Sequence, residues 1–120
     1  MDFRKLSIVI PAYNEGRTIH LILDKVKAVQ LIANIEKEVI IVNDCSKDNT
    51  EEAIQQYMAA NPELNIQYVR HEINMGKGAA LHTGIKKASG EYLIIQDADL
   101  EYDPREYNDI LKPVLEGFAD

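Results

Sequence analysis

The sequence predicts an α/β fold: a Rossmann-like, doubly wound and mainly parallel sheet in a three-layer αβα arrangement. Three observations predict it. Short runs that are apolar throughout alternate with segments of helical periodicity, which is typical of parallel strands covered by helices on both faces. Strand and helix follow each other in strict alternation along the chain. Polar clusters follow several of the apolar runs, at the carboxyl ends where such sheets bind their ligands.

The first part of the chain justifies a strand, a helix and a second strand. Residues 6–10 are an apolar run that we expect Pro11 to stop, because proline cannot donate to a sheet ladder. Residues 18–29 place apolar side chains at helical spacing on one face. Residues 39–42 are a β-branched run, typical of a buried strand, and they end in a polar turn at 43–46.

A second helix is predicted up to Ala60. Asp48 or Asn49 can cap it, and Glu51 or Glu52 stands at the distance of a capping box.

The second part of the chain justifies two more strand–helix pairs. Residues 66–69 are a weaker strand, and a loop then leads to the glycines of 76–78 and a helix of small residues that runs to Ala88. Residues 91–96 are the fourth strand, after a turn. A last helix begins at residues 103–104, with proline at its first position.

Composition limits the function classes. The chain has 120 residues, 46% of them hydrophobic and 28% charged, which is enough for one domain with a real core. A formal net charge of −7 argues against nucleic acid as a partner. The single cysteine allows no internal disulfide and favours a reducing compartment. No signal segment or membrane-length apolar run is visible, so we expect a cytoplasmic location.

An acidic pair follows the fourth strand and indicates a cation site. Asp97 and Asp99 are two residues apart, so in extended backbone their carboxylates point to the same side. Two such charges repel each other unless a cation lies between them, and carboxylate oxygens suit Mg²⁺ or Mn²⁺. Such a cation commonly carries a diphosphate. The alternative is an acidic turn before the last helix.

Four segments in order resemble the motifs of one enzyme family. They are residues 7–15 (SIVIPAYNE), 41–50 (IVNDCSKDNT), 74–80 (NMGKGAA) and 96–101 (QDADLE). Together they resemble the family 2 inverting glycosyltransferases, which have the GT-A fold. Within that family, the last motif and the following Tyr102-Asp103-Pro104 look most like the polyprenyl-phosphate branch, similar to dolichyl-phosphate mannose synthase.

The resemblance implies a role for each matching residue. It implies transfer of a sugar from a UDP- or GDP-sugar to a polyprenyl-phosphate or saccharide acceptor, with metal-assisted departure of the nucleotide. The implied nucleotide-binding residues are Pro11, Ala12, Tyr13, Glu15, Asp44, Lys77 and Asp97. The implied catalytic residues are Asp99 and Asp97, and the implied metal ligands are Asp99, Asp97 and Glu101.

Two departures from the family pattern lie in the second motif. Asn43 replaces the first acid of a pair and can still form hydrogen bonds. Cys45 replaces the usual glycine, which weakens the claim that this turn needs a positive φ. In the loop after the third strand, His71 is a further candidate for ligand contact.

Each residue taken alone also has a structural interpretation. Tyr13 can pack, Glu15 can favour a helix start, and Asp44 can close an Asx turn. The glycines of residues 76–78 serve equally well for close helix–sheet packing or for approach to a phosphate.

The resemblance also implies how the domain is organised. Family members continue into a second half with the acceptor site, so we expect residues 1–120 to be a single nucleotide-sugar-binding domain, truncated before that half and weakly active or inactive alone. A location at the cytoplasmic face of a membrane is compatible with this expectation. A non-catalytic nucleotide-binding module of the same fold stays open. The glycine fingerprint of NAD-dependent enzymes and the first loop of sugar nucleotidyltransferases are both missing.

Overall fold

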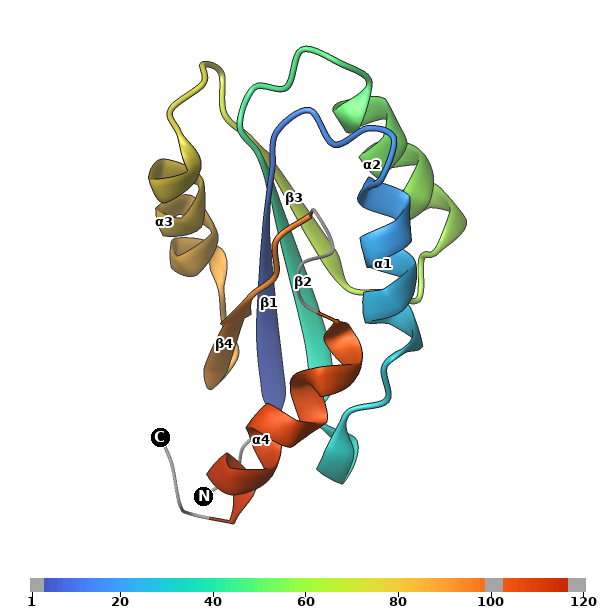
Figure 1. The fold of residues 1–120 in the computed structure, drawn as a ribbon, viewed down its shortest axis with the longest axis vertical. Coiled ribbons are helices and arrows are strands. Elements are labelled where there is room, and N and C mark those ends of the chain that lie inside the picture. Colours follow the sequence, from blue (N-terminus) through green and yellow to red (C-terminus); the bar gives the residue numbers. More distant parts are fainter. Residues whose placement is uncertain (1–3, 99–102, 117–120) are drawn as a thin grey trace.

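The computed structural model describes residues 4–98 and 103–116. Their strands form one parallel sheet in the order β3-β2-β1-β4 (Figure 1). The strands are β1 (Lys5–Ala12), β2 (Glu36–Asn43), β3 (Ile66–Arg70) and β4 (Tyr92–Ile95). The predicted parallel sheet is confirmed. The strand order reverses between β1 and β4, and the crevice at the carboxyl ends beside such a reversal is where this class of sheet binds ligands.

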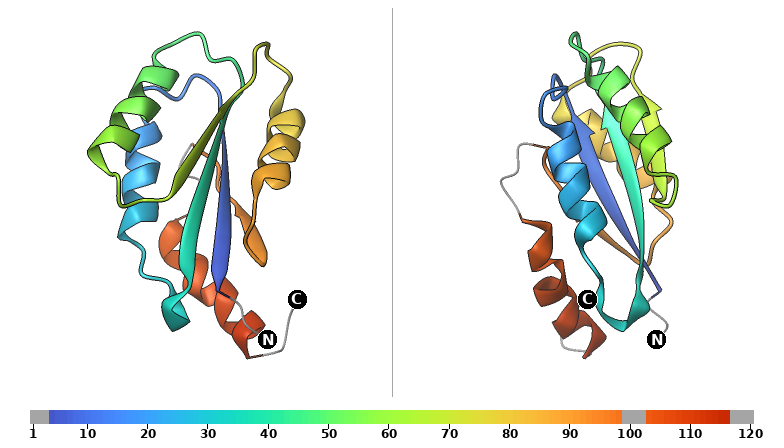
Figure 2. Two further views of the ribbon diagram at one scale, coloured as in Figure 1. Left: turned by 180° about the vertical axis from the view of Figure 1, so that it is seen from behind. Right: turned by 90° about the vertical axis from the view of Figure 1, so that its right-hand side faces the viewer.

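Helices cover both faces of the sheet, which confirms the three-layer arrangement. The helices are α1 (Ile19–Ala28), α2 (Thr50–Ala60), α3 (Lys77–Lys87) and α4 (Tyr107–Leu115), with short 3₁₀ turns η1 (Ile32–Asn34) and η2 (Pro104–Glu106). Figures 1 and 2 show α3 on one face and α1, α2 and α4 on the other. Each strand–helix–strand connection therefore crosses over one face of the sheet, as a parallel sheet requires.

The core has two parts because side chains of a strand point alternately to its two faces. Leu6, Ile8 and Ile10 of β1 are buried in the cluster that includes α1, α2 and α4. Val9 points to the opposite face and joins a smaller cluster with Ala80 of α3. The alternation fixes which side of β1 each neighbouring layer contacts.

β1 does not stop at Pro11 but continues to Ala12, which corrects the prediction. Asp44 N–H donates to Ala12 O, whereas Gln96 N–H donates to Val9 O on the other side of β1. Since backbone polar groups alternate sides along a strand, the nitrogen of Pro11 faces the β4 side. The β1–β4 pairing has already ended there, so no donor is needed.

The predicted capping box of α2 is not formed. The Asn49 side chain caps no backbone group, and the Glu51 carboxylate instead accepts from the Tyr68 hydroxyl at 2.9 Å. The other predicted cap, Asp48, is confirmed, because its Oδ1 accepts from the backbone N–H of Thr50 at 3.0 Å. The tertiary contact with β3 therefore replaces only the glutamate part of the predicted capping box.

Candidate functional site

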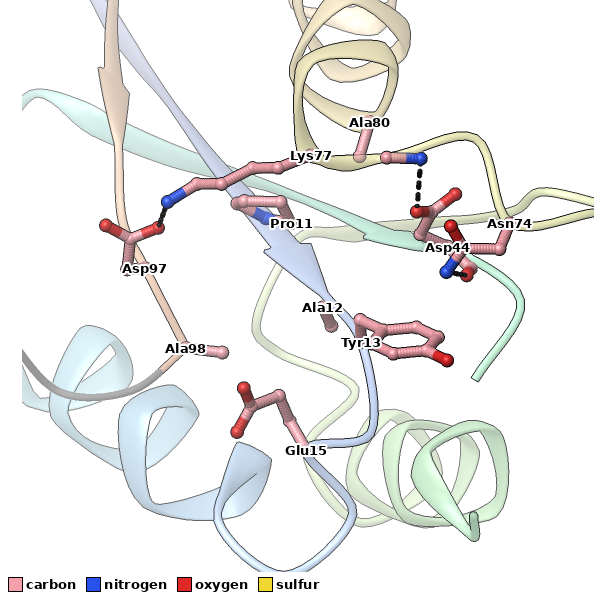
Figure 3. A pocket seen from close by; sticks show the side chains of 11 residues that line it. Pro11, Ala12, Tyr13, Glu15, Asp44, Asn74, Lys77, Ala80, Asp97 and Ala98 are labelled. Carbon is pink, nitrogen blue, oxygen red and sulfur yellow. Dashed lines mark hydrogen bonds and ion pairs between the residues drawn. The ribbon is translucent and has the colours of Figure 1, made fainter. Parts of the chain in front are cut away.

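A pocket of about 390 Å³ lies at the carboxyl edge of the sheet, around the ends of β1, β2 and β4. It is lined by Pro11, Ala12, Tyr13, Glu15, Asp44, Asn74, Gly76, Lys77, Ala80, Asp97 and Ala98. The lining includes every residue predicted from the sequence to bind nucleotide (Figure 3). The other two predicted site residues, Asp99 and Glu101, lie outside the described residues.

Asp44, directly after β2, is the most constrained acid of the pocket. Its side chain is buried, and it accepts hydrogen bonds from Met75 N–H at 2.9 Å and Gly76 N–H at 2.8 Å. His71 Nδ1 lies 2.8 Å from its Oδ1. The carboxylate therefore holds the loop before α3 instead of closing the Asx turn of the structural interpretation. The side chain that bonds locally in this segment is that of Asn43, whose Oδ1 accepts from the N–H of Ser46, three residues on, at 3.0 Å.

The Asp44 carboxylate is held in its ionised form. Burial raises its pKa, but hydrogen bonds from Met75 N–H, the His71 ring and Gly76 N–H outweigh burial, so the pKa is below the usual value. An ionised carboxylate can only accept hydrogen bonds. Asp44 therefore presents an acceptor to the pocket.

His71 is not one of the residues that line the pocket. It is buried, and its Nε2 lies 2.8 Å from Thr83 Oγ1 while Nδ1 faces Asp44. Both ring nitrogens are thus used within the protein. The expectation of a direct ligand contact by His71 is wrong because these contacts leave the ring no nitrogen for a ligand.

Tyr13 and Glu15 extend β1 into the pocket. Tyr13 is 41% exposed, so its ring is not a core packing element and offers a face to the pocket. The Glu15 carboxylate accepts from the Thr18 hydroxyl at 3.1 Å, and the Glu15 carbonyl accepts from the backbone N–H of Ile19 at 2.8 Å. Glu15 therefore stabilises the start of α1 while its side chain lines the pocket.

Gly76, just before α3, and Gly78, in its first turn, do not serve close packing. A Cβ added to Gly78 would meet nothing within 4 Å, and the same holds for Gly76. Gly76 has a φ of +94°, a conformation that favours glycine. The glycine that packs against the sheet is Gly84, where a Cβ would lie 2.4 Å from Val9 Cγ1. Gly76, which lines the pocket, and Gly78 are thus both next to open space.

An ion pair closes the other side of the pocket. Lys77 Nζ, at the start of α3, lies 2.5 Å from Asp97 Oδ1, directly after β4 (Figure 3). Asp97 is the described member of the predicted metal ligands. Within residues 4–98 and 103–116, no group of three His, Cys, Asp or Glu side chains forms a metal site. The Lys77 ammonium supplies the positive charge next to Asp97 in this structure.

The turn after β2 has the positive φ that a cysteine made less expected. Cys45 has a φ of +58° although it is not glycine, so the inference drawn from its side chain is wrong. The turn is held in this conformation by hydrogen bonds around it: Ser46 Oγ donates to Asn43 Oδ1 at 2.6 Å and accepts from Asn14 N–H at 2.9 Å. Asn43, which stands where the family has an acid, is held by its bonds from Ser46.

Residues of the second motif that received no site role from the sequence hold the loop after β1. Asp48 Oδ2 accepts from Gly16 N–H at 3.1 Å, and Thr50 Oγ1 accepts from Glu15 N–H at 2.9 Å. Burial raises the pKa of Asp48, but its bonds from Thr50 and Gly16 hold that pKa below the usual value. The conspicuous polar run of residues 46–50 was the available signal for this role.

Known proteins are similar to this chain in sequence and in fold. The model of glycosyl transferase family 2 matches residues 7–120. An undecaprenyl-phosphate 4-deoxy-4-formamido-L-arabinose transferase of Yersinia enterocolitica is 34% identical over 116 residues, 96% of this chain and 35% of the relative. A poly-beta-1,6-N-acetyl-D-glucosamine synthase of Staphylococcus epidermidis is 39% identical over 98 residues, 82% of this chain and 22% of the relative. The chain thus spans about a third or less of these relatives.

Solved structures agree with the sequence comparison. The mannosyltransferase PcManGT from Pyrobaculum calidifontis, in complex with GDP-Man and Mn²⁺, superposes with a TM-score of 0.78 at 28% identity, over 96% of this chain and 32% of that one. None of the helices in the described ranges is long and apolar enough to cross a membrane. With the family match over residues 7–120 and the shared fold, this chain belongs to glycosyl transferase family 2.

Proposed function

We propose that this chain binds the nucleoside diphosphate sugar, a UDP- or GDP-sugar, of an inverting glycosyl transfer. One observation carries the proposal: the pocket at the β1–β4 reversal has two chemically different sides. Asp44 and Tyr13 lie on one side, Lys77 and Asp97 lie on the other, and Pro11 lies between them (Figure 3). The first side suits a planar base with N–H donors, and the second suits a diphosphate with its cation.

The donor set at the diphosphate side fits a divalent cation. Asp97 provides a hard carboxylate oxygen, and its ion pair with Lys77 shows that a positive charge is favourable at this place. Asp97, with Asp99 and Glu101 from the same motif, would hold Mg²⁺ or Mn²⁺. When bound, the cation neutralises charge on the departing diphosphate as a Lewis acid. The relative from Pyrobaculum is a Mn²⁺ complex.

The chain's own residues then divide the work. Asp44 accepts from the base, and the face of Tyr13 covers base or ribose. Glu15, fixed at the start of α1, accepts from ribose hydroxyls. Lys77 would exchange its bond to Asp97 for one to the diphosphate, and Asp97 would then be able to hold the cation.

The acceptor of the whole protein is a polyprenyl phosphate or a saccharide, in keeping with the names of the two relatives. A phosphate acceptor is already anionic, whereas an alcohol acceptor needs a general base. A polyprenyl-phosphate acceptor would place the whole protein at the cytoplasmic face of a membrane. That this chain alone transfers sugar poorly stays a prediction.

A thermal-unfolding panel tests the donor proposal. UDP, GDP and dTDP are added with Mn²⁺ and again with chelator to wild type, Asp97→Asn and Asp99→Ala. A ligand at a hundredfold excess over its dissociation constant stabilises by about 2.7 kcal/mol. We expect one nucleotide to raise the Tm of wild type with Mn²⁺, and chelator or either variant to reduce that rise.

The matched control is Glu52→Gln, which removes one exposed negative charge on α2, away from the pocket. It should respond to nucleotide like wild type. A rise in Tm that survives both chelator and Asp99→Ala contradicts the cation bridge. Stabilisation by NADH, with none by any of the three nucleotides, contradicts the proposed function itself.

A further inference from the structure

Behind the pocket, one side chain connects three elements that the pocket needs. His71 follows β3 and is only 9% exposed. Its Nδ1 lies 2.8 Å from Asp44 Oδ1, after β2, and its Nε2 lies 2.8 Å from Thr83 Oγ1 on α3. His71 does not line the pocket, and both of its ring nitrogens bond to protein atoms.

The bonds of Asp44 show what His71 adds. Each carboxylate oxygen can accept about two hydrogen bonds. Among the described residues, Oδ1 accepts from His71 and from Met75 N–H, and Oδ2 accepts from Gly76 N–H. His71 thus completes the bonding of Oδ1, and the acceptor position that remains for a ligand is on Oδ2.

The Asp44 carboxylate determines that Nδ1 of the His71 ring carries a proton. An ionised carboxylate cannot donate, so the proton between the two groups is carried by His71 Nδ1. The Nε2 lies 2.8 Å from Thr83 Oγ1, and a hydroxyl can either donate to a ring nitrogen or accept from it. The two bonds connect α3 through His71 to Asp44, and the Nδ1 bond has a defined direction.

The bonds of His71 to Asp44 and Thr83 link the two sides of the pocket. Thr83 and Lys77 belong to the same helix, and Lys77 bonds Asp97 at the diphosphate side. His71 ties that helix to Asp44 at the base side. A change at His71 therefore alters both the orientation of the Asp44 carboxylate and the support of the helix that carries Lys77.

We propose that His71 is a positioning residue of the nucleotide pocket, which fixes the Asp44 carboxylate and α3 relative to each other without touching the ligand. The inference rests on the proposed function and deepens it. A site residue whose orientation is fixed before binding loses less freedom when the ligand arrives, so removal of the fixing partner weakens binding.

Three variants separate the two bonds. His71→Asn keeps an N–H donor close to the place of Nδ1 and loses the Thr83 bond. His71→Phe keeps a ring and loses both bonds. Thr83→Val removes only the hydroxyl. Dissociation constants for UDP and GDP with Mn²⁺ are measured by calorimetry on the 120-residue chain, at a temperature where circular dichroism shows each variant folded.

We expect His71→Phe to weaken binding roughly tenfold, the lower end of the loss seen when the partner that orients a metal ligand is removed. His71→Asn should restore most of that loss, and Thr83→Val should fall between them. Nitrogen NMR of wild type without nucleotide should show His71 with a proton on Nδ1. The control is Glu38→Gln. Glu38 lies on β2, bonds Ser89 after the other end of α3 and does not line the pocket, so this variant should leave the dissociation constant unchanged.

The outcomes separate this inference from the proposed function. Equal binding by folded His71→Phe and wild type overturns the inference alone, as does equal weakening in His71→Asn and His71→Phe. A His71 ring without a proton on Nδ1 also overturns it, whatever the nucleotide result. If wild type binds no nucleotide, the proposed function fails and the inference fails with it. If His71→Phe does not fold, His71→Asn and Thr83→Val decide by the same measurement.

Discussion

The two ends of α3 are each held to the sheet by a buried carboxylate from the region of β2, and the two carboxylates differ in ways that matter. Asp44, after the strand, binds the loop before α3 through Met75 N–H and Gly76 N–H. Glu38, near the start of the strand, binds the turn after α3 through Ser89, whose N–H lies 2.9 Å from its Oε1.

The two carboxylates are alike in burial and in charge. Both side chains are almost inaccessible to solvent. Burial raises the pKa of Glu38, but bonds from Ser89 and Ser7, with the charge of Lys5, hold that pKa below its usual value. The pKa of Asp44 is lowered in the same direction. A buried carboxylate with a lowered pKa is therefore no sufficient mark of a functional site in this fold.

The difference lies in position and in the donors. Asp44 stands at the carboxyl edge and lines the pocket, whereas Glu38 stands toward the opposite edge and does not. Backbone N–H groups hold Asp44, and these can only donate. Hydroxyls of Ser7 and Ser89 supply much of the bonding of Glu38, and a hydroxyl can donate or accept. We infer that substitution of Asp44, at the pocket end of α3, is tolerated less well than substitution of Glu38 at the other end.

The largest effect that we expect is the difference in unfolding free energy between Asp44→Asn and Glu38→Gln. An amide at position 44 must point its NH₂ group at a backbone N–H, because both carboxylate oxygens accept bonds from N–H groups. At position 38 the Ser89 hydroxyl can turn and accept from the new NH₂ group. We expect Asp44→Asn to lower the free energy of unfolding by about 3 kcal/mol and Glu38→Gln by about 1 kcal/mol. Urea unfolding measures both.

Nucleotide affinity sharpens the same comparison. Asp44→Asn should lose affinity for the nucleotide that binds wild type, and Glu38→Gln should keep it. Equal stability losses with equal affinities would mean that the two ends of α3 are interchangeable, contrary to the comparison.

The next largest effect is that of low pH, which should reduce the stabilisation that Asp44 and Glu38 provide at the two ends of α3. Because the folded pKa of each carboxyl is lowered, its stabilisation is complete above the unfolded value of about 4 and is lost as the pH falls below it. Each carboxylate that gains a proton only on unfolding adds at most about 1.4 kcal/mol per pH unit to the slope. Glu38→Gln should flatten the curve of unfolding free energy below pH about 4. An unchanged slope would show that Glu38 has the same pKa in both states.

The smallest expected effect compares strained turns at the two ends of the sheet. Cys45 has a φ of +58° at the pocket edge, and Ala33 has a φ of +57° in η1 at the other. A left-handed conformation costs a non-glycine residue about 1–2 kcal/mol, and glycine loses about 0.5–1 kcal/mol through chain entropy. Cys45→Gly and Ala33→Gly should each stabilise by about 0.5 kcal/mol. Thermal unfolding detects the gain. Cys45 Sγ lies 3.5 Å from the Glu72 carbonyl oxygen, and a loss of stability in Cys45→Gly would show that this contact outweighs the strain.

By itself, the sequence determined the parallel sheet, its helices and the edge where the site lies. Apolar runs such as 39–42 and helical spacing such as 18–29 are local patterns, and they specify elements without knowledge of their neighbours. Carboxyl ends of parallel strands share one edge of the sheet whatever the strand order. Residues as distant as Tyr13 and Asp97 could therefore be placed at one pocket in advance.

Only the tertiary structure decided the partners. The order β3-β2-β1-β4 brings Lys77 to Asp97, and it brings Met75 and His71 to Asp44. The structure also showed that Cys45 adopts a positive φ. These contacts join residues remote in the chain, and no periodic pattern encodes them. The physical reason is that burial favours apolar positions locally, whereas a hydrogen bond needs a specific atom that only the assembled fold brings within reach.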